Sequence, residues 1–310
     1  MKSSFGQNTP RFGQPNFAQG IVNPAALAID SRIMVDMVFR NQWAGFAGAP
    51  STGAVNAQFE LYHDMAAGLA VSYDLIGVHH ETHVSGQYSY RAFLANGNAM
   101  IFGASVGIDQ RVHDLASAQT IDANDPKFAT TTSKLYFNSG FGMFYNAPNF
   151  YIGASIPQLF ENRNIIGIDF RPYRWHYNVS GGLYAHVSER YTFNPNFQLN
   201  AVFNAPIQAD IVLRNTFSNS WSLVVGYRTE NAVILGFDFL VGGVFRMGYS
   251  FNYGVDKLAT IKGMSNELYV GIGLPYHNSR EEFGQRRYLN KKGKFRRDFR
   301  RGYDHRKWYK

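Results

Sequence analysis

Three histidines and a glutamate crowd one short segment of this sequence, where His79, His80 and His83 lie beside Glu81. Imidazoles at this density are typical ligands of zinc or copper. Two interpretations remain open: a metal site, and a solvated loop whose exposed side chains lack the supporting shell that fixes ligand geometry. We expect the solvated loop and no bound metal.

Enzymatic chemistry would need a nucleophile with its base, a phosphate-binding loop or a metal-hydrolase motif, and none of these patterns occurs in the sequence. The sequence also has no cysteine, which excludes thiolate metal ligands, a cysteine nucleophile and disulfide bonds. We therefore expect neither catalytic residues nor a cofactor, and no enzyme activity.

The strongest charge pattern is a basic, aromatic-rich tail at residues 277–310. It holds thirteen of the thirty Lys and Arg residues but only four of the twenty-two Asp and Glu residues, so residues 1–276 are nearly neutral. On a soluble protein this pattern predicts RNA binding. After a membrane domain it predicts a periplasmic tail that docks a protein partner, peptidoglycan carboxylates or anionic lipid head groups, and no nucleic acid. The candidate docking residues are Arg286, Arg287, Lys291, Lys292, Arg296, Arg297, Arg300, Arg301 and Trp308.

Alternation of apolar and polar residues predicts the elements that position these groups. Tyr177, Val179 and Leu183 fall on one face of a segment whose other face holds Asn178 and Ser180, which is the period of a β-strand. No run approaches the roughly 18 apolar residues of a membrane-spanning helix. The same test predicts fourteen strands, near residues 31–40, 53–61, 65–74, 83–92, 98–109, 133–145, 148–156, 174–187, 192–204, 206–217, 220–228, 231–240, 243–254 and 266–274.

Several features favour strands whose apolar face points outward into lipid. Residues 1–276 carry 35 charged side chains, which is sparse beside the roughly 25–35% of a soluble surface. Short connections alternate with longer ones, as they do between the periplasmic and external ends of outer-membrane barrels. Aromatic residues stand near the ends of the predicted strands, where interfacial girdles form: Trp43, Tyr73, Tyr145, Trp175 and Trp221.

These patterns predict an all-β protein, a transmembrane antiparallel outer-membrane β-barrel of about 14 strands. Residues 1–30 would form a segment in the lumen, like a plug, or in the periplasm, residues 31–276 the barrel, and residues 277–310 the periplasmic tail. The N-terminus lacks the apolar core of a secretory signal peptide. An exported barrel would therefore have lost its signal, unless the start codon is misplaced.

Charged side chains on the polar faces of the strands would line the interior of this barrel. Both signs are represented, which allows two interpretations: a purely structural network of paired charges that fills the lumen, or a selective pore. We favour pairing. The residues concerned are Asp36, Arg40, Glu60, Asp74, Arg91, Asp109, Asp210, Arg214, Arg228, Asp238, Arg246 and Glu267.

Several short motifs follow one another in a fixed order along the chain. The N-terminal motif consists of Pro10, Phe12, Gln14, Phe17, Asn23 and Pro24. It is followed by the segments 40–46 (RNQWAGF), 48–52 (GAPST), 151–157 (YIGASIP), 248–253 (GYSFNY) and 266–268 (NEL). In content and spacing this series resembles the PorP/SprF family of outer-membrane proteins.

The resemblance implies an outer-membrane component of the type IX secretion and gliding machinery of Bacteroidota. It implies four partners: secreted adhesin-type cargo with a type B C-terminal domain, periplasmic motor-ring lipoproteins, a peptidoglycan-binding protein, and outer-membrane lipids. The runner-up function is a channel or transporter for small solutes or hydrophobic substrates.

A cluster at the end of the first strand is the candidate cargo-binding rim. Its members are Arg40, Gln42, Trp43, Phe46 and Pro50. The alternative interpretation makes Trp43 an interfacial anchor and Arg40 a lumen charge with a local partner.

Overall fold

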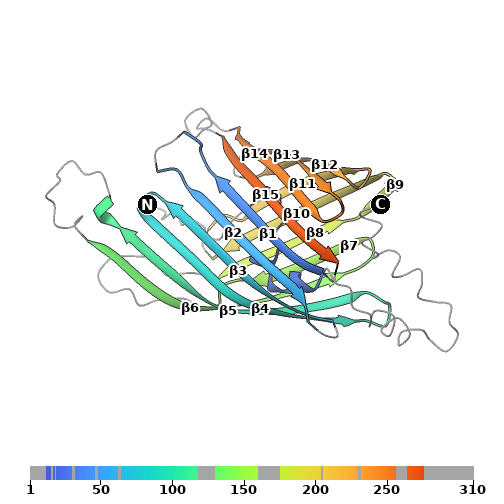
Figure 1. Ribbon diagram of the computed structural model, residues 1–310, viewed down its shortest axis with the longest axis horizontal. Helices are drawn as coiled ribbons and strands as arrows, with labels where there is room; N and C mark the ends of the chain where they lie inside the picture. Colours follow the sequence, from blue (N-terminus) through green and yellow to red (C-terminus); the bar gives the residue numbers. More distant parts are fainter. Residues whose placement is uncertain are drawn as a thin grey trace.

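The structure is a computed structural model of the 310-residue chain. It describes residues 12–14, 17, 19–29, 32–45, 48–61, 64–117, 130–159, 175–203, 205–229, 232–255 and 264–275. Almost all of this part of the chain is β-strand, with three short 3₁₀ helices (Figure 1). Among these residues, no helix is long and apolar enough to cross a membrane.

The first part of the chain contains two 3₁₀ helices and then long strands. These elements are η1 (Gln19–Ile21), η2 (Pro24–Ala28), β1 (Arg32–Asn41), β2 (Ser51–Glu60), β3 (Met65–Ile76), β4 (His79–Phe93), β5 (Ala99–Asp114), η3 (Leu115–Ser117) and β6 (Thr131–Asn146). The remaining strands are β7 (Phe150–Ile156), β8 (His176–Leu183), β9 (Ala185–Ser188), β10 (Tyr191–Val202), β11 (Gln208–Phe217), β12 (Trp221–Arg228), β13 (Ala232–Val241), β14 (Phe245–Gly254) and β15 (Ser265–Pro275).

The strands form one antiparallel sheet that closes on itself. Except for β8 and β9, each strand pairs with its sequence neighbours, β1 pairs with β15, and the pairing of β10 with β11 completes the ring. Strands β8 and β9 both pair with β10 and are separated only by Tyr184, so they act as one interrupted strand. The closed barrel therefore has fourteen strands, and the predicted fold class is confirmed.

The connections at one end of the barrel are all short, and the longest connections lie at the other end, which also holds a two-residue turn between β3 and β4. At one end, tight turns follow β4, β6, β9, β11 and β13, and Asn219 adopts the positive φ of 53° that a two-strand hairpin turn favours. Longer connections, such as residues 115–130 and 157–175, follow β5 and β7 at the other end. By the usual barrel topology, we assign the short turns to the periplasm and the longer connections to the cell surface.

The prediction of a loop around His79 to His83 is wrong. Strand β4 begins at His79, directly after a two-residue turn in which Gly77 has a φ of 60°. The signal was missing because His79 to His83 are polar on both faces of the strand. The outer ends of β4 and β5 extend beyond the segment in which one face must be apolar, so no alternation marks them.

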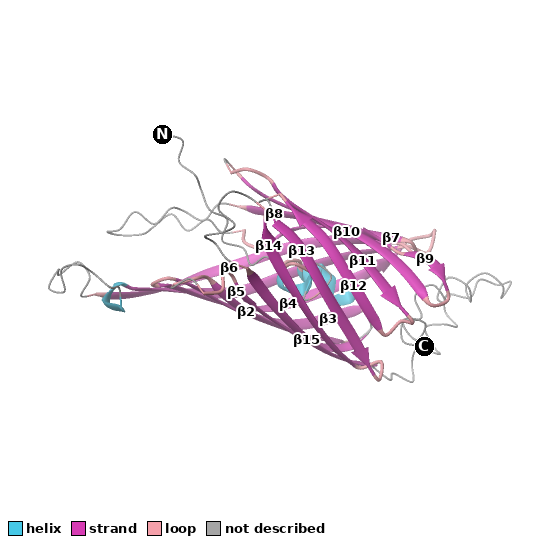
Figure 2. Ribbon diagram, turned by 90° about the horizontal axis from the view of Figure 1, so that it is seen from above, coloured by secondary structure: helices cyan, strands magenta, loops and turns pink. Residues whose placement is uncertain are grey.

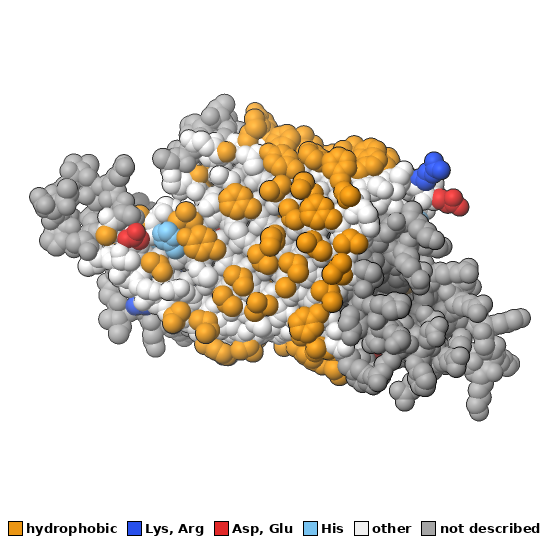
Figure 3. All heavy atoms as spheres, viewed as in Figure 1, with side chains coloured by type: hydrophobic (Ala, Val, Ile, Leu, Met, Phe, Trp, Pro, Cys, Tyr) orange, Lys and Arg blue, Asp and Glu red, His pale blue; other side chains and the backbone are white. Residues whose placement is uncertain are grey.

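The barrel has an apolar exterior and a polar interior. On β5, Phe102, Val106 and Ile108 point outward with 41–57% of their surface exposed, while Ser105 and Asp109 point inward and are buried. Figure 3 shows that hydrophobic side chains cover the outer face of the strands. This inversion of a soluble protein's surface confirms the predicted membrane orientation of the strands.

Aromatic side chains gather near both ends of the apolar face. At the periplasmic end the ring of Phe217 stacks between Tyr191 and Trp221, with centroid separations of 5.2 and 4.5 Å. At the outer end Trp175 and Tyr177 meet edge to face, 6.3 Å apart. Such belts place amphipathic rings at the level of the lipid head groups.

A basic side chain placed in the middle of the apolar face should destabilise the barrel. Val106 lies near the middle of β5, and Val106→Arg is expected to cost about 2–4 kcal/mol because the cation faces hydrocarbon. The measurement is a urea titration of the protein in lipid vesicles, in which gel electrophoresis without heating shows the concentration at which the folded, heat-modifiable band disappears. The control is Gln110→Arg, on the same face of β5 but nearer its outer end, where the cost should fall to about 0–1 kcal/mol. Equal shifts for the two variants would contradict a lipid-facing assignment of Val106.

Candidate functional site

The described residues of the N-terminal segment lie inside the barrel, where Figure 2 shows η1 and η2 enclosed by strands, whereas η3 lies at the outer tip of β5. Helix η2 packs against the inner faces of β2 to β6, most closely against β4, β5 and β6. We call residues 12–29 the plug. Within this range, residues 15, 16 and 18 lie outside the described part of the chain.

Asn23 fixes the lower part of the plug to the barrel wall. Its side-chain oxygen accepts a hydrogen bond of 3.0 Å from the backbone N–H of Ala25 and so caps η2, which begins with Pro24. Its side-chain N–H groups donate to the backbone oxygens of Met143 on β6 and Ala154 on β7, at 3.4 and 3.3 Å. One buried amide therefore shapes the helix start and ties it to two strands.

Glycines on the inner faces of the strands let the plug approach the wall closely. A Cβ atom at Gly103 would overlap the backbone of Pro24 and Ala25, and a Cβ atom at Gly142 would overlap the side chain of Asn23. Only glycine fits at these two positions while η2 is docked. The β5 and β6 wall is therefore shaped to this segment.

Phe17 anchors the middle of the plug between an aromatic ring and two cations. Its ring stacks on Tyr269 of β15, with centroids 3.8 Å apart and an angle of 9° between the planes. The guanidinium groups of Arg214 and Arg246 lie 4.9 and 5.7 Å from the Phe17 centroid. Phe17, Tyr269 and Arg214 are shielded from water, which strengthens stacking and cation–π contacts, whereas Arg246 is 30% exposed.

The upper part of the plug is bound to charged groups at the outer ends of the strands. The backbone N–H of Gly13 donates to Glu267 of β15 at 2.6 Å, and the backbone oxygen of Phe12 accepts from Arg228 of β12 at 3.4 Å. Glu267 also faces Arg40 on β1, with 3.4 Å between the charged atoms. The plug thus runs from the outer end of the lumen at Phe12 to its periplasmic half at η2.

The interior charges form buried pairs. Arg228 donates to both oxygens of Asp210 at 2.9 Å, and Arg214 donates to Asp238 at 2.6 Å. All four side chains are at least 90% buried. These pairs, and that of Arg40 with Glu267, confirm the pairing interpretation of the lumen charges. Pairing is expected because burial of an unmatched charge is costly.

The plug also covers the junction between the first and last strands. Phe12 and Phe17 pack with Val38 of β1 and Tyr269 of β15 in one buried apolar cluster. Across the same junction, the hydroxyl of Tyr269 donates to Asp36 of β1. The junction between β1 and β15 is therefore stabilised both by the plug and by direct contacts between the two strands.

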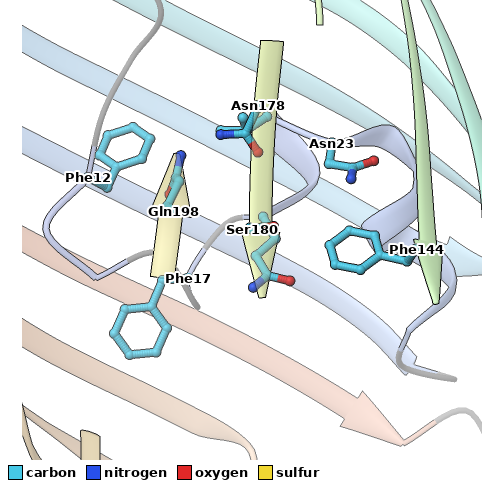
Figure 4. Close-up of a pocket in the computed structure, with 9 residues that line it drawn as sticks. Phe12, Phe17, Asn23, Phe144, Asn178, Ser180 and Gln198 are labelled. Carbon is cyan, nitrogen blue, oxygen red and sulfur yellow. The ribbon is translucent and has the colours of Figure 1, made fainter. Parts of the chain in front are cut away.

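Two small cavities lie between the described residues of the plug and the wall. A cavity of about 20 Å³ separates the plug from the amide-lined faces of β8 and β10, where Figure 4 shows Asn178, Ser180 and Gln198 opposite Phe12 and Phe17. A second cavity, of about 10 Å³, lies against β14 and β15. Each has room for about one or two water molecules. Neither cavity offers a path for a solute through the described interior.

The candidate rim residues are only partly brought together. The backbone N–H of Gln42 donates to the oxygen of Pro50 at 2.8 Å, and that of Trp43 donates to Ser265 at 3.3 Å, so these residues meet at the outer end of the barrel. Arg40 is 7% exposed, points into the lumen and pairs with Glu267, as the alternative interpretation expected. Phe46 lies outside the described residues, and cargo binding by the others stays a prediction.

The histidines noted in the sequence point in different directions. His80 faces outward and bonds to Tyr73, while His83 faces inward and bonds to Asp109. Within the described ranges, no group of three or more His, Cys, Asp or Glu side chains converges.

Two sets of predicted residues cannot be located. Pro10 and the whole basic tail lie outside the described residues. Conversely, Gly103, Gly142 and Tyr269 contact the plug but were not predicted to do so. Tyr269 gave no signal because apolar residues flank it on both sides in the sequence.

A closed antiparallel barrel with an apolar exterior, aromatic belts and a polar interior defines an outer-membrane β-barrel protein. The chain belongs to the family of type IX secretion system membrane proteins PorP/SprF, whose family model matches residues 4–272. The family is therefore one of secretion-system membrane proteins rather than of enzymes, and together with the fold it indicates the outer membrane. No curated protein sequence matches the chain.

A solved hydrocarbon channel shares the fold, and other solved structures are similar to a lower degree. The CymD monoaromatic hydrocarbon channel is 11% identical, with a TM-score of 0.51 over 86% of this chain and 94% of that channel. The Pseudomonas putida toluene transporter TodX and a Pseudomonas aeruginosa FadL homologue are also 11% identical, each with a TM-score of 0.48. The matches cover 86% and 87% of this chain and 95% and 96% of theirs. At this identity the likeness concerns the fold alone.

Proposed function

We propose that this protein assists the delivery and surface anchoring of adhesin-type cargo, within the type IX machinery to which its family belongs, as a plugged barrel and not as a conduit. The observation that carries the proposal is the filled lumen. Asn23 holds the plug to β6 and β7, and Gly13 and Phe17 hold it to β15. Cargo that reaches the surface would then pass beside this barrel and be retained at its outer end.

The outer rim is the proposed contact surface for the cargo, which carries a type B C-terminal domain. Gln42 binds Pro50 there, and the next residue, Trp43, adopts a φ of 50°, a backbone conformation that is uncommon for a bulky residue and in which its N–H bonds to Ser265. A tryptophan at such a rim is a suitable anchor for a protein partner.

The periplasmic partners would be motor-ring lipoproteins and a peptidoglycan-binding protein. The support is the basic tail, whose cations alternate with aromatic residues in the sequence. Such a segment suits an acidic protein surface. Deleting residues 280–310 should remove the lipoproteins from purified complexes while the adhesin stays bound.

The test is a pull-down of the detergent-solubilised protein from native envelopes, with mass spectrometry of the bound proteins. Recovery of a large surface adhesin with motor-ring lipoproteins is the expected result, and Trp43→Ala should reduce the adhesin several-fold. The matched control is Trp221→Ala, a girdle residue at the periplasmic end, which should leave recovery unchanged. A barrel that emerges alone and conducts ions would instead support a solute channel.

A further inference from the structure

Two histidines meet at the outer tip of the barrel. His79 begins β4 and lies directly opposite His113 near the end of β5. Their Nδ1 atoms are in contact, and the ring centroids are 4.6 Å apart with an angle of 74° between the planes. The side chain of His79 is exposed, so solutes from outside can reach the pair.

The register of the strands explains why these two residues converge. Directly opposed side chains on antiparallel strands have Cβ atoms about 4.5–5.5 Å apart, which suits two imidazoles that share one ligand. The adjacent row, one layer deeper, pairs Glu81 with Arg111 at 3.5 Å, and the Arg111 guanidinium lies 4.8 Å from the centroid of the Tyr136 ring. The nearest cation of that row is therefore already engaged by a carboxylate and an aromatic face.

We propose that His79 and His113 form a binding site for a divalent transition metal at the mouth of the barrel. Imidazole nitrogen suits Cu²⁺ and Zn²⁺, and Cu²⁺ should bind more tightly because it forms the more stable complexes with nitrogen ligands. A tetrahedral ion bound at 2.0–2.1 Å would hold the two Nδ1 atoms about 3.3 Å apart. That needs only a small opening of two side chains at an exposed strand tip, and water fills the remaining coordination positions.

The test is a titration of the folded, detergent-solubilised protein with Cu²⁺ and separately with Zn²⁺, followed by calorimetry and, for Cu²⁺, by electron paramagnetic resonance. We expect one site, two nitrogen ligands in the Cu²⁺ spectrum, and a loss of at least about tenfold in affinity in His79→Ala and in His113→Ala. The matched control is His80→Ala, which removes an outward imidazole bonded to Tyr73 and should leave the affinity unchanged.

The outcomes separate the proposed site from incidental binding. If the wild-type protein binds metal no more tightly than the two variants do, the histidines form an ordinary hydrogen-bonded pair and the proposal fails. It also fails if only one of the two substitutions matters, or if His80→Ala weakens binding equally, because the metal is then held by single surface imidazoles. Heat-modifiable migration of each variant shows that the barrel is intact, so a loss of binding reports on the site.

Discussion

A barrel that carries Gly103→Ala and Gly142→Ala together is expected to lose its plug from the wall and to conduct ions, whereas the wild-type barrel stays closed. The added methyl groups would overlap the backbone of Pro24 and Ala25 and the side chain of Asn23. The backbone of Ala25 cannot give way while η2 stays docked. The plug must therefore leave its seat, and a lumen lined by polar side chains fills with water.

Single-channel recording in planar bilayers measures this effect. The control is Gly86→Ala on the outer face of β4, where the nearest atom to an added Cβ is a backbone oxygen at 4.0 Å. Should the double variant fold but remain electrically silent, the plug would not be what closes the lumen. Asn23→Ala provides a milder version, since it removes the bonds to Met143 and Ala154 without adding volume.

Arg228→Ala should destabilise the barrel by about 3–5 kcal/mol, because it leaves Asp210 buried and unmatched by its guanidinium partner. It also removes the bond to the backbone oxygen of Phe12. The measurement is the urea concentration at which half of the protein has lost the folded electrophoretic band. Removing both partners, in Asp210→Ala with Arg228→Ala, should restore part of the loss, as expected for two coupled groups.

Arg246→Ala is the comparison for this effect. Its side chain is 30% exposed and lies 3.7 Å from Asp238, a carboxylate that Arg214 already binds. Solvent screens a partly exposed pair, so the substitution should cost no more than about 1 kcal/mol. Equal shifts for Arg228→Ala and Arg246→Ala would show that burial of the ion pair does not set its contribution.

The strands could be predicted from the sequence because lipid and lumen impose opposite demands on alternate residues. Tyr177, Val179 and Leu199 face outward while Asn178 and Asn200 face inward and bond to each other, and this contrast is visible in the sequence. The outer end of β4, from His79, was not predicted as strand because its residues are polar on both faces. Parity also placed Arg40 on the lumen face, where it lies, although its position at the end of β1 suggested the rim.

The plug could be suspected but its seat could not be predicted. Glu267 accepts a hydrogen bond from the backbone N–H of Gly13, which lies 254 residues away in the sequence. A glycine has no charged side chain that would mark it as the partner of a glutamate. Gly103 looks like any other small residue in an alternating strand until the backbone of η2 lies against it. Contacts of this kind depend on how the closed barrel surrounds a distant segment, and no local pattern encodes them.

The position of the plug has a consequence for how the barrel closes. Strands β1 and β15 are the first and last strands of the described residues, so the ring is complete only when these two strands pair. Phe17 and Gly13 contact Tyr269 and Glu267 on the last strand, from a segment that immediately precedes the first. The segment that precedes β1 thus fastens β15, the strand on the far side of the closing junction, from inside the barrel. A barrel without this segment would be held closed at that junction by strand pairing and the side chains that cross it alone.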